Sequence, residues 1–451
     1  MVVKSLSGQI KQVDLTAGDN GQIGTLLLDP DSIVIQAATP DINGDATTGD
    51  DITLATDLDD HATDFAGQAS IITSGAVETL LNGASLTLDA LNTITVNDAI
   101  TQNTAPGTLT LESATVNINQ AITLNGGAGV GALVVQGDAG GAATNININA
   151  AVTTGGTQTY TGPVNVGASV ALTGSSHTFS STVGLGANTL TLSNTGTTTI
   201  STVIDGTGGI TKTGVGTLVL SGTNTYTGTT TISAGTLTLQ GGSAIEDTAD
   251  IIMASGAAIL DIDATETIDR LDTVAGDVVN LDASLTLNQG TVFGVVQGTG
   301  GLTKETAGSL TLRGTNTYSG ATTLNGGTTV SQNATALGDG SATNTLIFGA
   351  GGANLQISTA DVTSPAARGV TLTGTGTITT DSGRAISIAG VITGAGALQK
   401  NGAGTLTLTG TNTYTGTTTI NQGILNANSS AAIGDGSATN TLIINGGATL
   451  Q

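Results

Sequence analysis

The side chains best placed to do chemistry in this sequence are its carboxylates, which are clustered. Twelve Asp residues lie between Asp14 and Asp64, and ten Asp or Glu residues lie between Glu246 and Asp282. Arg270 is the only Lys or Arg in the second stretch. Grouped carboxylates can bind a hard cation such as Ca²⁺, or they can serve as the acid and base of glycoside hydrolysis.

Calcium binding is suggested by a short segment of the first cluster. Asp41, Asn43 and Asp45 place oxygen ligands at alternate positions, as a calcium loop does. An EF-hand loop would need Gly at its sixth position and Glu at its twelfth, where this sequence has Ala46 and Ile52. The segment is therefore interpreted as a solvated acidic loop, with calcium binding as the alternative.

A second calcium candidate is the glycine-rich segment Gly126–Gly131. It begins like the calcium-binding repeat of RTX proteins. Gly131 stands where that repeat needs Asp, so the segment lacks a ligand. The sequence therefore predicts no firm metal site and no other cofactor.

Glycoside hydrolysis is the other chemistry that carboxylates could serve. The residue types for it are supplied by Asp261, Asp263, Glu266 and Asp269. Carbohydrate clefts usually stack sugars on aromatic rings, and the chain has no Trp. A lyase would need a basic residue, but Lys212, Lys304 and Lys400 recur at one repeat position, which indicates a structural role. We therefore predict that the protein is not an enzyme.

The composition excludes several further classes. The chain of 451 residues has no Cys, which rules out disulfides and thiolate zinc sites. Its net charge of −24 argues against binding to nucleic acid or to an anionic bilayer. His61 and His177 are far apart in sequence, and we expect both to be surface residues.

The same composition favours a repetitive β structure. Only 2% of the residues are aromatic and 9% are charged, whereas 38% are hydrophobic and 68 are Gly. A large compact core would use more aromatic side chains, and a disordered chain would be less hydrophobic. Small aliphatic residues with Thr and Gly suit a thin, elongated β fold.

Three segments repeat one pattern. Each has a Lys, then a Gly, two strand-like Leu positions and Gly-Thr-Asn-Thr-Tyr, within Gly208–Gly228, Gly300–Gly320 and Gly396–Gly416. All four tyrosines occur in this context, the fourth in a weaker copy at 157–162. We interpret these tyrosines as turn or coil-cap residues, with a recognition stripe as the alternative.

A ten-residue identity fixes the length of the repeat. Gly338–Ile347 recurs unchanged as Gly434–Ile443, an offset of 96 residues. Internal repeats of this kind indicate stacked or arrayed units. The last copy is incomplete, so we expect the chain to be a fragment of a longer protein.

Apolar and polar residues alternate within the repeats, as in Leu406–Thr409 and Val116–Asn119. This period of two is typical of strands. Ala69–Leu86 could be drawn as a helix, but Gly75 and Gly83 interrupt it, so no helix is expected there. Short strands separated by Gly and Asn predict a parallel β-helix with coils of about 20 residues and outward Thr and Asn ladders.

Runs of Thr raise an ice-binding alternative. An ice-binding face needs Thr at a strict coil period. The runs Thr229–Thr231 and Thr417–Thr419 return only at the long repeat spacing. Ice binding is therefore not expected.

Two families resemble parts of the chain. Gly298–Gly320, Ala258–Asp263 and Thr267–Leu271 resemble the passenger-associated repeat of bacterial autotransporters. Gly24–Ile35, Asn92–Ile100 and Gln158–Val164 resemble filamentous-haemagglutinin-like exoproteins of two-partner secretion. Both resemblances imply an all-β, right-handed, single-stranded parallel β-helix, an elongated rod exported through an outer-membrane transporter to the surface of a Gram-negative cell.

One continuous β-helix is expected over 1–451. Its predicted parts are an acidic segment at 1–64, haemagglutinin-like coils at 65–205, and passenger repeats at 206–299, 300–395 and, truncated, 396–451.

The resemblance implies an adhesin that attaches to host cells, other bacteria or matrix through an unidentified receptor or glycan. The alternative is a structural stalk or filament-forming element, with lateral or end-to-end self-association. No ligand-binding residue follows from the sequence.

Overall fold

The computed structural model describes residues 32–36, 70–137 and 140–451. The chain divides into two compact units, Met1–Gly228 (unit 1) and Thr229–Gln451 (unit 2). The predicted calcium ligands Asp41, Asn43 and Asp45 lie outside the described residues, as do His61 and most of the acidic segment 1–64.

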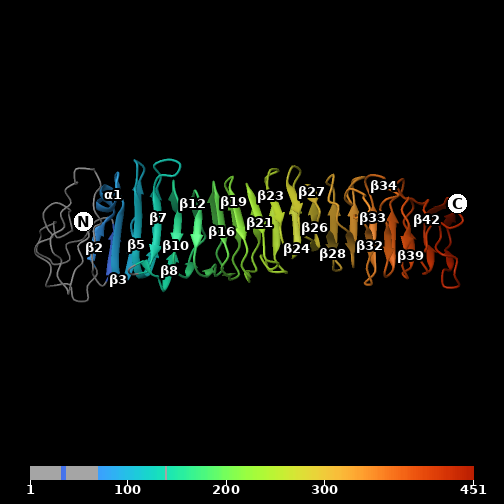
Figure 1. Ribbon diagram of the computed structural model, residues 1–451, viewed down its shortest axis with the longest axis horizontal. Coiled ribbons are helices and arrows are strands. Elements are labelled where there is room, and N and C mark those ends of the chain that lie inside the picture. The colour runs from blue at the N-terminus through green and yellow to red at the C-terminus, as the bar shows by residue number, and fades with distance from the viewer. Residues whose placement is uncertain (1–31, 37–69, 138–139) are drawn as a thin grey trace, which may run out of the picture. The chain divides into compact units, whose positions relative to one another are not determined.

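The described residues of unit 1 form one helix, α1 (Ser74–Leu81), and parallel strands that lie side by side (Figure 1) and make two stacks. The first stack is β1 (Ser32–Gln36), β2 (Ser70–Thr73), β3 (Leu86–Val96), β5 (Thr108–Ile118), β7 (Ala132–Gln136), β8 (Asn145–Ile148), β10 (Gln158–Tyr160), β11 (Val164–Val166), β13 (His177–Phe179), β14 (Val183–Gly184), β16 (Thr197–Ile200), β17 (Ile204–Asp205) and β19 (Thr217–Leu220). The second stack is β4 (Ile100–Gln102), β6 (Ile122–Leu124), β9 (Val152–Thr154), β12 (Val170–Gly174), β15 (Leu190–Asn194) and β18 (Ile210–Thr213).

Unit 2 has its strands in three stacks. The first is β21 (Thr236–Leu239), β23 (Ile259–Ile262), β25 (Val278–Leu281) and β27 (Val295–Gly298). The second is β20 (Thr230–Ile232), β22 (Asp250–Met253), β24 (Glu266–Thr273), β26 (Leu285–Val292), β28 (Leu302–Lys304), β29 (Ser309–Leu312), β30 (Thr322–Leu324), β31 (Thr328–Ser331), β32 (Leu346–Phe348), β33 (Ala353–Ile357), β35 (Val370–Leu372), β36 (Gly376–Thr380), β38 (Ile392–Thr393), β39 (Leu398–Asn401), β41 (Thr418–Ile420) and β43 (Leu442–Ile444). The third is β34 (Val362–Ser364), β37 (Ala385–Ile388), β40 (Thr405–Leu408), β42 (Gly423–Ala427) and β44 (Ala448–Leu450).

Each unit is a β-solenoid, in which one coil pairs with the next in parallel. In unit 1, Leu172 pairs with Leu192 and Leu192 pairs with Lys212, so each coil there takes 20 residues. In unit 2, Ile251 pairs with Leu271, again 20 residues on. The predicted parallel β-helix is therefore confirmed. Its coils vary around the expected 20 residues, from 17 between Val278 and Val295 to 30 between Thr115 and Asn145.

Alternation along each strand builds the core. In β15, Leu190 and Leu192 are fully buried, whereas Thr191 and Ser193 face outward and are half-buried. Ile, Leu and Val supply most of the buried positions. Small aliphatic side chains suffice because each inner residue packs on a like residue one coil away.

The expectation of no helix near Gly75 is wrong, because α1 spans Ser74–Leu81. Gly75 lies in its first turn, where the Thr73 side chain caps the helix by accepting from the Ala76 N–H. Gly83 lies beyond the last turn with φ +79°. Glycines at helix ends terminate or cap a helix, whereas glycines in its interior destabilise it.

The Asn of two Gly-Thr-Asn-Thr-Tyr segments, Asn316 and Asn412, joins three successive coils. Asn316 is buried; its Oδ1 accepts from the Val296 N–H at 2.9 Å, and its Nδ2 donates to the Ala336 carbonyl at 2.7 Å. Asn412 does the same between Ile392 and Ala432. The side chain thus supplies the hydrogen bonds that the backbone cannot make at this corner.

Outward Asn residues form ladders, as predicted. In unit 1, Asn149 donates to Asn119 at 2.7 Å and Asn119 donates to Asn97 at 2.9 Å. Such ladders satisfy the amides along the stack and leave an uncharged, polar outer face.

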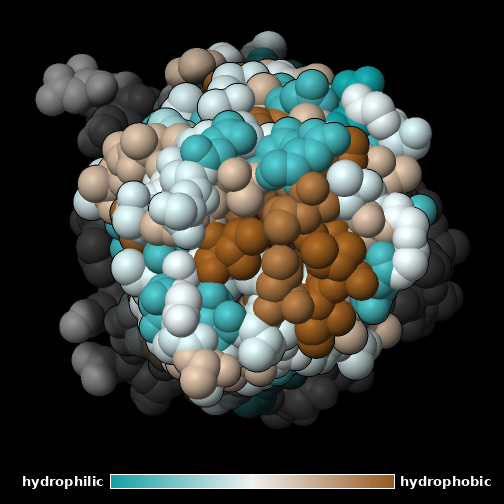
Figure 2. Space-filling model, turned by 90° about the vertical axis from the view of Figure 1, so that its right-hand side faces the viewer, coloured by the Kyte–Doolittle hydropathy of each residue, from teal (hydrophilic) through white to brown (hydrophobic). Residues whose placement is uncertain are grey.

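Apolar side chains are concentrated on the face of unit 2 that Figure 2 presents. Leu442, Ile443 and Ile444 of β43 are 40–47% exposed there. The equivalent Leu346, in the identical ten-residue segment, is 1% exposed because Val370 of β35 pairs with it. The exposed side chains of β43 are therefore of the same type as those that are buried between coils at β32.

We predict that Asn316→Ala lowers the free energy of unfolding of unit 2 by about 2–5 kcal/mol, because it leaves one buried N–H and one buried carbonyl unpaired. Urea titration followed by circular dichroism measures this change. Thr317→Ala, at the exposed neighbouring position, is the control and should cost under about 1 kcal/mol. Equal losses in the two variants would contradict the bridging role.

Candidate functional site

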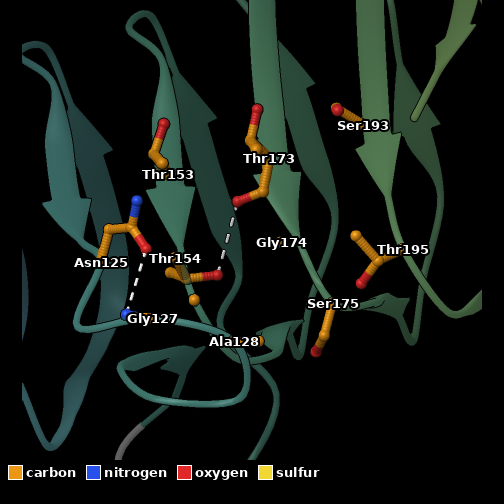
Figure 3. Close-up of a pocket in the computed structure, with 11 residues that line it drawn as sticks. Asn125, Gly127, Ala128, Thr153, Thr154, Thr173, Gly174, Ser175, Ser193 and Thr195 are labelled. Carbon is orange, nitrogen blue, oxygen red and sulfur yellow. Dashed lines mark hydrogen bonds between the residues drawn. The ribbon is translucent and has the colours of Figure 1, made fainter. Parts of the chain in front are cut away.

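A hollow of about 210 Å³ opens on unit 1 (Figure 3). It crosses four successive coils, at β6, β9, β12 and β15 and the loops that follow them. Its lining residues are Asn125, Gly127, Ala128, Thr153, Thr154, Gly155, Thr173, Gly174, Ser175, Ser193 and Thr195. No lining residue is charged.

The parallel register stacks the hydroxyl groups of one wall. Thr153 pairs with Thr173, and Thr173 pairs with Ser193, so these three outward side chains lie on neighbouring rungs (Figure 3). Neighbouring rungs are about 4.8 Å apart. The same column continues through Thr123 on one side and Thr213 on the other.

Single Thr residues, unlike the runs of three, do recur from coil to coil. Thr101, Thr123, Thr153 and Thr173 share one register position in successive coils. The intervals between them are 22, 30 and 20 residues, so the sequence hides the regularity. This is a single column over β4, β6 and β9, since each of these three-residue strands has one outward position.

A glycine-rich loop after β6 forms another wall of the hollow. Gly127, Gly129 and Gly131 have φ of +112°, +80° and +80°, a region that favours Gly. The Gly129 N–H donates to the Gly155 carbonyl, and the Gly156 N–H donates to the Gly131 carbonyl, both at 2.7 Å. The loop that begins like a calcium repeat is thus anchored through its backbone to the next coil.

A buried polar network lies behind the hollow. Gln158 Nε2 donates to the Thr173 carbonyl at 2.8 Å and to Thr154 Oγ1 at 3.3 Å. Tyr160 Oη donates to Gln158 Oε1 at 2.9 Å, and Tyr160 stacks on Phe179. Burial raises the pKa of Tyr160 far above its usual value, so the phenol stays protonated. The network fixes the backbone of the hydroxyl wall.

The hollow offers hydrogen bonds but no catalytic groups. Its polar side chains are hydroxyls and one amide, none of which titrates near neutral pH, and the Ala128 side chain together with Thr methyl groups and backbone carbon makes most of its surface apolar. Neither a nucleophile–base pair nor a carboxylate pair lines it. The arrangement can therefore bind a polar, uncharged molecule.

The carboxylates of the second acidic cluster lie in unit 2. Oxygen atoms of Asp261, Asp263 and Asp282 lie within 4.8 Å of one another. Partial burial, and then the charges of Asp263 and Asp282, raise the pKa of Asp261. Three carboxylates at this separation could share a hard cation, although exposed acidic groups are common without one.

Glu266, one of the residues considered for glycoside hydrolysis, turns into the core instead. Its carboxylate accepts from the backbone N–H of Ala244 at 3.1 Å and of Ile245 at 3.4 Å. Burial raises the pKa of Glu266 to about 7, and this effect outweighs the two hydrogen bonds, which act to lower the pKa. Asp269 accepts from Gln289 at 2.8 Å. The four residues therefore do not form one groove.

The repeated lysines are structural, as predicted. Lys400 is fully buried, and its Nζ donates to the carbonyls of Asn401 and Gly402 at 2.7 Å and of Gln422 at 3.2 Å. Burial lowers its pKa to about 8. Lys304 is 1% exposed and likewise donates to backbone carbonyls.

The tyrosines do not form a recognition stripe, because all four are fully buried. Tyr318 and Tyr414 lie between strands, as expected of turn residues, and hydrogen-bond Thr322 and Thr418 at 2.7 and 2.6 Å. Tyr160 differs, because it lies within β10.

The expectation that His177 is a surface residue is wrong. It is 2% exposed, and its register partner is Gln158. Its Nδ1 lies 3.3 Å from Thr198 Oγ1, while Nε2 has no partner in the described part of the chain. Burial, and then the charge of Lys212, lower its pKa to about 4. His177 therefore belongs to the buried polar column behind the hollow.

Comparison with known proteins gives the family. Residues 210–239, 302–330 and 398–427 match the model described as Passenger-associated-transport-repeat. The chain therefore carries passenger-associated-transport repeats, and they support an autotransporter passenger with β-helix repeats. The passenger resemblance is thereby confirmed, whereas nothing found supports the two-partner alternative. Similarity to autotransporter passengers indicates a location on the cell surface, associated with the outer membrane.

A curated relative extends the similarity beyond the repeats. The chain is 32% identical to "Adhesin BmaC autotransporter" of Brucella suis biovar 1 (strain 1330), over 96% of this chain and 12% of that protein. No solved structure matches the chain significantly. In the described part of the chain, no helix is long and apolar enough to cross a membrane.

We predict that Glu266 makes unit 2 less stable as pH rises from 4.5 to about 7. Its folded pKa of about 7 exceeds the unfolded value of 4.5, so the folded state holds a proton that the unfolded state has released. Urea midpoints of the wild type and of Glu266→Gln measure the effect. The difference between the two urea midpoints should change between pH 4.5 and about 7. A difference that stays constant over this range would contradict the predicted role of Glu266.

Lys400 should have the opposite effect at higher pH. Its folded pKa of about 8 is below the unfolded 10.5, so stability should rise between pH 8 and 10 as the folded state loses its proton first. Lys400→Met should remove this contribution. Gln399→Met, at the outward half-buried neighbour, should keep it. Urea midpoints at pH 8, 9 and 10 distinguish the two outcomes.

Proposed function

We propose that this chain is an adhesive part of a passenger, which attaches the cell to host cells, other bacteria or matrix. The observation that carries the proposal is the alignment of 96% of the chain with an autotransporter adhesin. The chain spans 12% of the length of that relative, so its activity reaches this chain as a proposal. An outer-membrane transport domain is the partner that export of a passenger requires.

The geometry supports binding by the solenoid surface. Each coil presents outward Thr, Ser and Asn at half-buried positions of rigid strands, so the polar groups are held in place before a ligand arrives. Rigid presentation lowers the entropic cost of binding. A binding role also agrees with the hollow, which has hydrogen-bonding groups and no catalytic ones. We propose no enzymatic step.

A structural stalk is the second candidate function. The regular coil stacking supports it, since parallel pairing of successive coils can build a long, stiff element. A stalk would hold a binding element elsewhere and would need no site of its own.

Adhesion is tested by displaying residues 1–451 on a non-adherent Gram-negative strain through a heterologous autotransporter transport domain. We expect at least a tenfold increase in bacteria retained on an epithelial monolayer, and a loss of that increase when soluble chain is added as competitor. The control strain carries the transport domain alone. Retention equal to the control on cells, bacteria and matrix would favour the stalk.

A further inference from the structure

We propose that the hollow of unit 1 is a binding site for an uncharged oligosaccharide, with the column Thr153, Thr173 and Ser193 as its principal hydrogen-bonding wall. The inference rests on the proposed adhesive function and names the class of ligand for it.

The hydroxyl groups of the hollow have unused hydrogen-bonding capacity. Within the described residues, no other group of the chain hydrogen-bonds to the side-chain oxygens of Thr153, Thr173 or Ser193. The hydroxyl groups of Ser175 and Thr195, on the rim of the hollow, likewise have no hydrogen-bond partner among the described residues. Five hydroxyls that can each donate and accept therefore border one hollow.

The spacing of these hydroxyls selects an extended ligand with a repeating unit. Rungs follow one another at about 4.8 Å, close to the length of one sugar residue in an extended oligosaccharide. Successive sugar hydroxyls can therefore meet successive rungs. None of the lining residues is aromatic, so the sugar rings would not stack on an aromatic platform. The methyl groups of Thr153, Thr173 and Ala128 supply the apolar contacts for the sugar C–H groups instead.

The charge of the site selects a neutral ligand. None of the eleven lining residues is a Lys, Arg, His, Asp or Glu. An acidic sugar would find no cation in the hollow and would approach a chain of net charge −24. Sulfated, sialylated and uronic-acid chains are therefore disfavoured.

Buried residues hold the backbone behind the hollow. Gly174 is an inward position of β12, where a Cβ would lie 2.8 Å from the buried Thr154 Oγ1 and 2.9 Å from the Gly156 carbonyl, so a larger residue would displace the coil beneath the hydroxyl column. Gln158 holds the Thr173 backbone from behind. Buried polar residues here replace the apolar ones that fill this column elsewhere, such as Leu133, which pairs with Gln158.

The size of the site predicts weak binding. A hollow of about 210 Å³ is smaller than the typical ligand pocket of about 300–1,000 Å³. It accommodates one or two sugar rings, with the rest of the chain lying along the column. Many copies on one cell surface would raise the overall avidity by multivalency.

Purified full chain is tested by saturation-transfer NMR against neutral hexasaccharides of β-1,4-glucose, α-1,4-glucose, β-1,3-glucose and β-1,4-N-acetylglucosamine, with a heparin hexasaccharide as the acidic probe. We expect at least one neutral probe to bind in the millimolar range and heparin not to bind. The variant Thr153→Val, Thr173→Val, Ser193→Ala keeps the shape of the wall and should weaken binding at least tenfold.

The matched control is Thr191→Val with Thr211→Val, on the neighbouring outward column of β15 and β18, and it should bind like the wild type. Ser175→Phe fills the hollow from its rim and should also abolish binding, which covers the case in which the triple variant does not fold. Absence of binding by every neutral probe, preference for heparin, or equal loss in the control would overturn the proposal.

Cell retention separates this inference from the function on which it rests. Retention that is unaffected by the triple variant and by the bound hexasaccharide would leave adhesion standing and would overturn the glycan site as its cause. Sugar binding without any retention would contradict adhesion while supporting the site.

Discussion

The register between successive coils is the constraint on which the rest of the structure depends. Parallel pairing sets equivalent residues of neighbouring coils about 4.8 Å apart, so each side chain meets a like position above and below it. Leucine columns, asparagine ladders and hydroxyl columns are three results of this one rule. A shift of one residue would exchange the inner and outer faces, and this penalises any other register.

At the corners between strands, the backbone no longer makes the regular hydrogen bonds between coils, so side chains must supply them. Asn316 and Asn412 supply these hydrogen bonds between coils. Lys400 donates hydrogen bonds to the backbone carbonyls of a turn. The recurrent Gly-Thr-Asn-Thr-Tyr segment is therefore a corner whose Asn and Tyr side chains face inward, while its two Thr side chains face outward. This explains why the most regular polar residues of the sequence are buried, and why the outer surface is left to Thr, Ser and Asn.

Much of the fold could be predicted from the sequence, because alternation and repeats are local patterns. The buried state of His177 could have been found in the same way, since it alternates with Phe179 on the inward face. The hollow could not be predicted. It needs Thr153, Thr173 and Ser193 in one column, and that depends on coil lengths that Gly-rich loops make irregular.

Burial of the lysines has a consequence for the outside of the molecule. Lys212, Lys304, Lys400 and Arg368 are at most 3% exposed, so four of the nine Lys and Arg residues are hidden from solvent. A neighbouring molecule thus meets a surface with fewer cations than the composition implies. With a net charge of −24, two copies brought side by side would repel one another, and dissolved salt would screen that repulsion.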